Sequence, residues 1–173
     1  MPGFPEPRDG RLVVRSAGQA GSPDLGREWV TTAGVCDTPP MLQIAAEQPG
    51  TGGVLVRLVL GVEKSTTFLV IRGSATAPGA NVGVQMYTKL GSFAYQAQEG
   101  SVDISSLGSS VTGRFAVTLT EIASKAQVRF VGSFRDIPVT KLDPTLCAPL
   151  PPPTPPRLPT APAGSSPSAQ RRE

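Results

Sequence analysis

Few residues in this sequence are of a type that performs catalysis, and one common type is missing. The chain has no histidine, the side chain that most often transfers protons near neutral pH and that completes Ser–His–Asp and Cys–His nucleophilic sites. Its two cysteines, Cys36 and Cys147, are too few for a four-cysteine zinc or iron–sulfur site. We therefore expect a protein without catalytic residues, bound metal or cofactor.

Carboxylates are the remaining catalytic candidates. A glycosidase needs two carboxyl groups that face each other across a cleft, one of them with a raised pKa. Asp103 alternates with Val102 and Ile104, which predicts that it faces water, and Asp136 precedes Ile137, which predicts a strand end. A carboxylate-based hydrolase that uses Asp103 and Asp136 is therefore the weakest hypothesis. The acids of the patterned region are Glu63, Glu99, Asp103, Glu121 and Asp136.

The two cysteines flank the region with strand-like patterns. A bridge between them would close a loop of more than a hundred residues, and loop-closure entropy makes such a bridge worth roughly 4–5 kcal/mol. On position alone we predict a Cys36–Cys147 disulfide. Because disulfides persist in oxidising compartments, this predicts a protein of the periplasm or a secreted one. Two unconnected buried thiols are the alternative.

The beginning of the sequence does not read as a signal peptide. Residues 1–21 carry five charged side chains, and their apolar cluster, Leu12–Val14, is too short for the hydrophobic region of such a peptide. A cytosolic protein, or an exported one whose signal is absent from this sequence, are the alternatives. No apolar run approaches the roughly 20 residues that a membrane-spanning helix needs, so no transmembrane segment is predicted.

The net charge of +3 is unevenly distributed. Residues 36–147 carry nine basic and eight acidic side chains, and the excess of basic residues lies mostly in the last 26 residues. Nucleic-acid-binding proteins concentrate basic residues on one face, whereas here the charges are scattered. We therefore expect no nucleic-acid binding.

Composition divides the chain into three parts. Residues 1–35 are an extension with little pattern, although Leu12–Arg15 is strand-like and Glu28–Val35 is a second possible element. Residues 36–147 form the predicted domain. Residues 148–173 hold nine of the nineteen prolines and are expected to be a disordered, extended tail. The tail is a passive terminus, a spacer to another surface or a PxxP ligand.

Short alternating segments joined by glycine-containing turns dominate the predicted domain. Strands at intervals of roughly 8–12 residues predict an all-β fold, an antiparallel β-sandwich with a small β-barrel as the alternative. Met41–Gln48 fits neither a helix nor a strand period cleanly. Glu99-Gly100 predicts a tight turn, and Pro138 predicts a strand end or an edge. The predicted strands are Val54–Leu60, Thr67–Arg72, Asn81–Lys89, Phe93–Gln98, Ser101–Ser105, Val111–Thr120 and Gln127–Phe134.

Two surfaces of this fold are candidates for binding. One exposed sheet face could bind a sugar or an acidic partner, or could simply be solvated. If the fold is a barrel, the inward-facing Gly113 and Gly132 could leave room for a small apolar ligand, as in lipocalins. The residues of the exposed face are Arg114, Thr118, Thr120, Arg129 and Arg135.

One part of the sequence resembles a known group of proteins. Gly100–Ile104, Gly113–Leu119 and Gly132–Pro138 read G-x-V-x-I, G-x-F-x-x-x-L and G-x-F-x-x-[IV]-P. This pattern, over Gly100–Val139, resembles the C-terminal strands of small uncharacterised secreted and lipoprotein β-sandwich domains of bacteria. The resemblance implies an exported β-sandwich and names no activity. Together with the cysteines, it leads us to expect a non-catalytic binding or structural module of the cell envelope, with a protein or carbohydrate partner.

Overall fold

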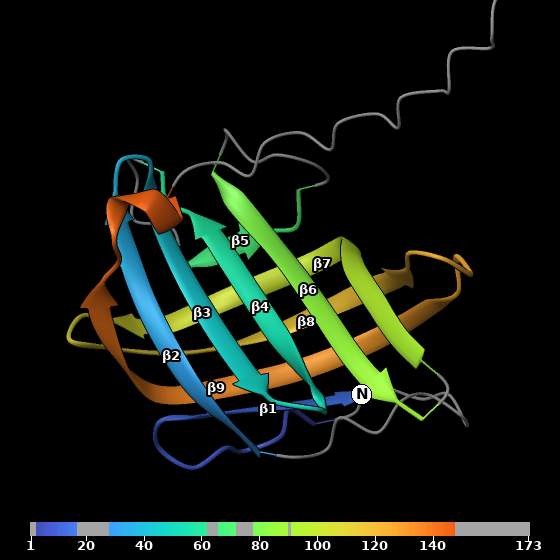
Figure 1. Ribbon diagram of the computed structural model, residues 1–173. Helices are drawn as coiled ribbons and strands as arrows, with labels where there is room; N and C mark the ends of the chain where they lie inside the picture. Colours follow the sequence, from blue (N-terminus) through green and yellow to red (C-terminus); the bar gives the residue numbers. More distant parts are fainter. Residues whose placement is uncertain (1–2, 17–27, 62–65, 72–77, 90, 148–173) are drawn as a thin grey trace, which may run out of the picture.

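Nine β-strands make up most of the described chain (Figure 1). The computed structural model describes residues 3–16, 28–61, 66–71, 78–89 and 91–147. No helix in these ranges is long and apolar enough to cross a membrane. The predicted tail at 148–173 lies outside the described residues. In chain order the elements are β1 (Arg11–Ser16), β2 (Glu28–Asp37), β3 (Pro40–Gln48), β4 (Gly52–Val59), β5 (Thr67–Leu69), β6 (Gly79–Thr88), β7 (Gly91–Leu107), β8 (Ser110–Glu121), β9 (Gln127–Lys141) and the 3-10 helix η1 (Pro144–Cys147).

Eight of the strands close into a barrel, and β5 is an additional strand. Hydrogen bonds join them in the order β7-β6-β4-β3-β2-β1-β9-β8, and β8 pairs with β7 to complete the circle. The all-β prediction is confirmed, but the fold is the barrel alternative and not the preferred sandwich. Alternation along a strand reports only which side chains face inward, and it does so equally in both architectures. The barrel also depends on the pairing of β1 with β9, the first strand with the last, and local patterns give no sign of it.

Strand β7 is long enough to serve two neighbours in succession along one edge. Its first part pairs with β6 and its second part with β5, whereas β8 follows the opposite edge. The strand bends between the two parts (Figure 1). Strand β5 thus pairs with the part of β7 that lies beyond its pairing with β6. Phe68 of β5 is buried in the core, whereas Leu69 is 68% exposed.

The predicted boundary at residue 35 does not separate two structural units in the described chain. Strand β1 lies between β2 and β9, pairing antiparallel with both. Beyond the end of β1, β2 and β9 pair directly and in parallel. Residues 11–16 and 28–37 are therefore strands of the barrel. Strand β1 has only six residues and buries Leu12, Val13 and Val14 in succession, so no alternation marks it in the sequence.

The barrel interior is filled by apolar side chains, two of which occupy the space expected above inward-facing glycines. Gly113 pairs with Phe134 and Gly132 pairs with Phe115 across β8 and β9. A Cβ atom placed on Gly132 would lie 2.3 Å from the Phe115 ring, and one on Gly113 would lie 2.6 Å from the Phe134 ring. Both rings are buried. The expectation that these glycines leave room for a ligand is therefore wrong, because each aromatic ring covers the glycine opposite it.

A β-bulge explains why one local prediction from the sequence failed. The predicted turn at Glu99-Gly100 lies inside β7, where the register against β8 shifts between Ala97 and Glu99 and Gly100 has a φ of 119°. A bulge of this kind bends a strand without ending it.

Two other predictions concerned the ends and the type of an element. Pro138 does not end β9, which continues to Lys141. Met41–Gln48 belongs to strand β3, which resolves the open choice between helix and strand.

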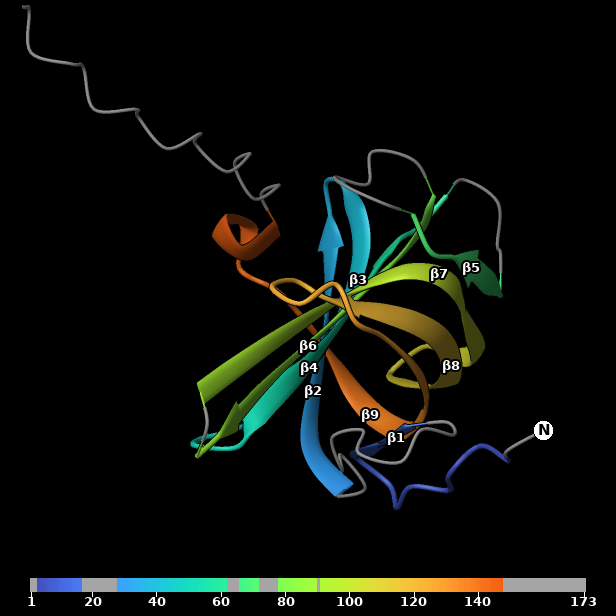
Figure 2. The same ribbon diagram turned by 90° about the vertical axis from the view of Figure 1, so that its right-hand side faces the viewer.

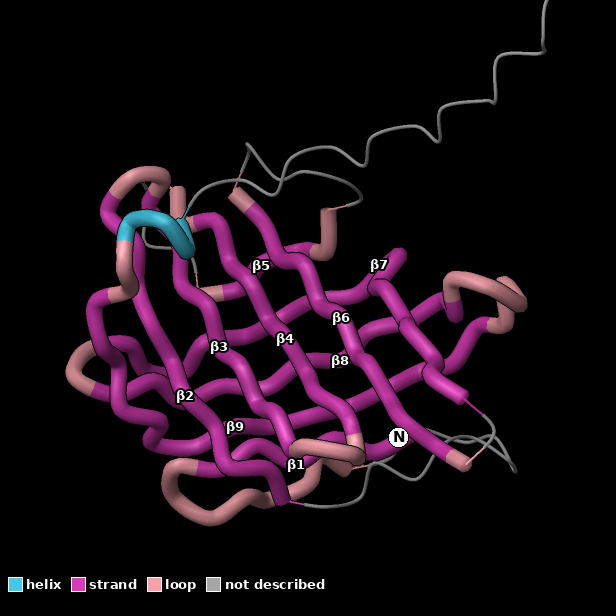
Figure 3. The backbone as a smooth tube through the Cα atoms, in the orientation of Figure 1, coloured by secondary structure: helices cyan, strands magenta, loops and turns pink. Residues whose placement is uncertain are grey.

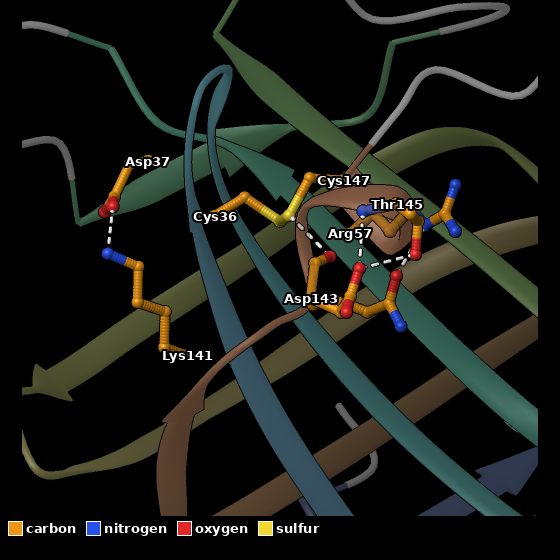
Figure 4. The surroundings of a disulfide bond; sticks show 8 residues. Cys36, Asp37, Arg57, Lys141, Asp143, Thr145 and Cys147 are labelled. Carbon is orange, nitrogen blue, oxygen red and sulfur yellow. Dashed lines mark hydrogen bonds and ion pairs between the residues drawn. A yellow bond between two sulfur atoms is a disulfide. The ribbon is translucent and has the colours of Figure 1, made fainter.

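A disulfide between Cys36 and Cys147 confirms the predicted pairing (Figure 4). It connects η1 to β2, and η1 lies beside the ends of β2 and β3 near the turn that joins them (Figure 3). Met41 and both cysteines form a small buried cluster there. Beside it, an ion pair with Asp37 raises the pKa of Lys141, chiefly through a side-chain hydrogen bond. The bridge thus links the first part of the barrel to the chain that follows its last strand.

Candidate binding site on the outer face of the barrel

Two β-bulges flank Thr112 on β8, one on each neighbouring strand. Against β9, the register shifts between Val111 and Gly113, so both Arg135 and Asp136 face Thr112. Against β7, it shifts between Ile104 and Ser106, which leaves Ser105 as the extra residue. Bulges are frequent at barrel rims and beside functional sites because they redirect side chains.

The β9 bulge places two consecutive side chains on the outside of the barrel. Phe134 and Ile137 are both buried, whereas Arg135 and Asp136 between them are both exposed. Asp136 has a φ of 45°, a conformation that few residues other than glycine adopt. Thr112 stabilises it, since its hydroxyl oxygen accepts a hydrogen bond from the Asp136 backbone N–H at 2.9 Å and donates one to the carboxylate at 3.2 Å.

A groove of about 790 Å³ runs along the outer face of β7, β8 and β9 beside these bulges. This volume lies within the range of small-ligand sites, roughly 300–1,000 Å³. Its charged lining comprises two cations and two acids, Arg114, Arg135, Glu6 and Asp103. Its hydroxyl lining is Thr66, Thr67, Ser105, Thr112 and Ser133.

One wall of the groove is the segment that precedes β1, which we call the strap (residues 3–9). Figure 2 shows this segment in dark blue beside β1 and β9. Pro5 and Pro7 are buried, and the Phe4 ring carries the Arg114 guanidinium at 4.7 Å from its centroid. The Gly10 N–H donates to the Arg135 carbonyl at 2.7 Å. The strap is therefore attached at several points along the groove.

An ion pair anchors the strap to β2. The Arg8 guanidinium contacts the Glu28 carboxylate, which also accepts a hydrogen bond from the Arg8 backbone N–H at 3.0 Å. The side-chain hydrogen bond from Arg8 is the main reason that the pKa of Glu28 lies below its ordinary value. The same contact raises the pKa of Arg8.

The two arginines of the groove are only partly engaged by acids. Arg114 approaches Asp103 through Nε at 3.5 Å, and Arg135 approaches Asp9 through Nε at 3.5 Å. Among the described residues, the terminal Nη atoms of the two arginines make no hydrogen bond. These paired N–H donors match the geometry of a carboxylate or another oxyanion.

The five residues predicted to form a binding face do not all lie together. Arg114 and Arg135 line the groove, as the previous observations show. Thr118 and Arg129 are cross-strand neighbours further along β8 and β9, and neither lines this groove. Thr120 lies still further along, and its hydroxyl is buried without a hydrogen-bond partner. The predicted face thus extends along β8 and β9, and the groove lies at its bulged end.

The two acids considered for hydrolysis each have their own structural partners. Asp103 accepts a hydrogen bond from the Thr67 hydroxyl at 2.9 Å and pairs with Arg114. Asp136 is held by Thr112, as described above. The acids belong to β7 and β9, on opposite sides of β8. These partners support structural roles for both carboxylates, and Asp136 lies within β9 and not at its end.

Sequence reasoning missed the strap and the bulges, which together make the groove. Phe4 and the prolines at 5 and 7 had no periodic pattern to mark them, and a bulge leaves no simple sequence signature. The Arg135-Asp136 pair between buried Phe134 and Ile137 is the one signal available, because two consecutive polar residues interrupt the alternation.

The described residues contain no group of three or more side chains suited to hold a metal ion. No protein-family model, curated protein or solved structure matches the chain. The class of the protein is therefore described by its fold and its groove. That class is a closed, disulfide-linked β-barrel with a polar groove between its outer face and an N-terminal strap.

Proposed function

We propose that this protein is a non-catalytic, extracytoplasmic binding module whose outer groove binds an anionic ligand. One observation carries the proposal. The guanidinium groups of Arg114 and Arg135 line the same groove, and their Nη atoms make no hydrogen bond to a described residue. An arginine fork that is fixed in place loses little conformational freedom when it binds an oxyanion.

The support for a location outside the cytoplasm is separate from the groove. The Cys36–Cys147 disulfide is of a kind that is rare in reducing compartments. The resemblance of Gly100–Val139 to strands of bacterial secreted proteins and lipoproteins agrees with export. A non-catalytic role is supported by the structural partners of Asp103 and Asp136 and by the absence of histidine.

The test is an NMR titration of the full chain that follows the arginine Nε–Hε signals. Trigalacturonate and a triglutamate peptide serve as anionic probes. We expect at least one probe to shift the signals of Arg114 and Arg135, and the Arg114→Gln and Arg135→Gln variants to bind it about tenfold more weakly or worse, because each loses a charge-assisted hydrogen bond. Arg129→Gln is the matched control, since this exposed arginine lies outside the groove.

Unchanged Arg114 and Arg135 signals with both probes would contradict the proposal. So would equal weakening by Arg129→Gln, because the binding would then depend on net charge and not on the groove. Circular dichroism of each variant establishes that its barrel is intact.

A further inference from the structure

We infer that the ligand of the groove is a saccharide that carries carboxylate groups. This inference rests on the proposed function, since it uses the same two arginines, but it depends on what the rest of the groove offers. The lining combines cationic donors, hydroxyl groups, acidic acceptors and one aromatic ring. Each of these groups limits the chemistry of the ligand.

The acceptors of the groove require a ligand with hydrogen-bond donors. Glu6 and Asp103 contribute carboxylates to the lining, and ionised carboxylates only accept hydrogen bonds. The Ser105 hydroxyl donates to the Thr112 carbonyl at 3.1 Å, which leaves its oxygen lone pairs as acceptors. A simple anion such as phosphate or sulfate would satisfy the arginines but would meet these acceptors with its own negative oxygens. A ligand whose acid is surrounded by hydroxyl groups satisfies both.

The Phe4 ring contributes an aromatic surface to a groove whose lining is both polar and apolar. Arg114 lies over the ring, yet Phe4 remains 38% exposed and lines the groove. Sugar rings present an apolar C–H surface together with hydroxyl groups at their edges. Such a ring can contact Phe4 while its hydroxyl groups reach the neighbouring Ser and Thr oxygens, which is the combination that a polar site with one aromatic residue favours.

The floor of the groove argues against an acidic peptide. Extended peptides commonly bind by adding a strand to an exposed sheet edge. Here the floor is β8, which pairs with β7 on one side and with β9 on the other, apart from the bulges beside Thr112. Strand β8 therefore offers no free edge to a peptide. A peptide would gain no strand-to-strand hydrogen bonds from it.

The experiment compares three probes by isothermal titration calorimetry with the full chain. Trigalacturonate carries both carboxylates and hydroxyl groups, its fully methyl-esterified form keeps the sugar and lacks the charge, and triglutamate keeps the charge and lacks the sugar. We expect trigalacturonate to bind at least tenfold more tightly than either of the others. Phe4→Ala should weaken trigalacturonate and leave triglutamate unchanged, and Phe4→Tyr should restore the binding.

The outcomes separate this inference from the proposed function. Triglutamate binding as tightly as trigalacturonate would overturn the saccharide while leaving the anionic groove in place. Equal binding of trigalacturonate and its ester would overturn the role of the carboxylate. Equal loss of both acidic probes in Phe4→Ala would show that Phe4 acts only by holding Arg114, and would also overturn the inference. Binding of none of the three would contradict the proposed function itself.

Discussion

Two walls of the barrel differ in regularity, and the difference decides where a site can form. The wall of β3, β4 and β6 pairs without a register shift. Small residues such as Ala45, Gly53 and Gly83 leave only a depression of about 390 Å³ on its outer face. The wall of β7, β8 and β9 contains bulges on both sides of Thr112 and bears the larger, charged groove.

A regular wall places its outward side chains in parallel rows, where they meet as cross-strand pairs such as Arg57 and Gln43. A bulge changes this locally, because it sets consecutive residues on one face and increases the twist of the strand. In this barrel the bulges bring Arg135, Asp136 and Ser105 around one threonine. The comparison indicates that departures from ideal pairing, and not the strands as such, create the groove.

The largest effect is expected from removal of the disulfide, because it closes the stretch of chain that contains both walls. Cys36 belongs to β2, and Cys147 lies 111 residues further along the sequence, after the last strand. Replacing both by serine releases a loop that contains β3 to β9. Loop-closure entropy predicts a loss of about 4–5 kcal/mol in the free energy of unfolding, measurable by urea denaturation.

Wild-type protein in reducing agent is the control, and it should match the double variant. A loss below about 1 kcal/mol would show that the unfolded chain is already restricted by residual structure, since such structure lowers the effect of a cross-link. The ligand affinity of the groove should change little, because neither cysteine lines it.

A pair of glycine substitutions compares the two walls directly. In Gly132→Ala, the new Cβ would lie 2.3 Å from the buried Phe115 ring, so we expect a loss of roughly 1–3 kcal/mol from overpacking. In Gly83→Ala on the regular wall, the nearest atom is the Tyr95 carbonyl oxygen at 3.8 Å. Alanine there should be neutral or stabilise by up to about 1 kcal/mol, because glycine weakens strand interiors.

Thermal and urea unfolding of both variants measure this difference. Similar stabilities for the two proteins would mean that the Phe115 ring has another position available. The interior beside the bulged wall would then be less tightly packed than the burial of Phe115 indicates.

Prediction from the sequence did not follow the division into walls. On the regular wall, the apolar run Val54–Leu60 and the alternation in Asn81–Lys89 correspond to β4 and β6 within two residues at each end, but β3 was left open. On the bulged wall, the alternation in Val111–Thr120 corresponds to β8 within one residue at each end. Alternation failed at Glu99-Gly100, because a glycine with positive φ serves a tight turn and a bulge equally well. It failed again at Asp136, where a strained residue within a strand resembles a strand end.

The sequence predicted some residues of the site but not their arrangement. Arg114 and Arg135 were identified as residues of an exposed face, but so was Arg129, which lies outside the groove. What distinguishes them is the β9 bulge and the position of Phe4, more than a hundred residues away in sequence. Such contacts depend on tertiary structure, and local patterns carry no information about them.

A smaller effect is expected from the hydroxyl that holds the bulge. Thr112→Val keeps the shape of the side chain but removes both hydrogen bonds to Asp136, so we expect a loss of about 1 kcal/mol in stability. Trigalacturonate affinity should fall as well, because Arg135 loses its fixed position. Thr118→Val is the matched control on the same strand, at a position with no side-chain hydrogen bond among the described residues. Equal effects of the two substitutions would contradict a special role for the bulge.

The smallest expected effect concerns the pH dependence of the strap. Arg8 lowers the pKa of Glu28 in the folded protein, so the contribution of this pair is present above the unfolded pKa of Glu, about 4.3. It is lost as the pH falls through the lower, folded pKa. We therefore expect Glu28→Gln to be less stable than the wild type at neutral pH and equal to it in acid.

NMR signals of the Phe4 ring protons report whether the strap keeps its contact with Arg114 as the pH is lowered. Glu121→Gln is the control. Hydrogen bonds from Ser124 and Ala123 lower the pKa of Glu121, so its removal should also cost stability at neutral pH. It lies at the last residue of β8, outside the groove, and should leave the Phe4 signals unchanged. Phe4 signals that stay constant in Glu28→Gln at every pH would show that the proline and Arg135 contacts hold the strap without the ion pair. The strap that forms one wall of the groove would then be held by packing and not by charge.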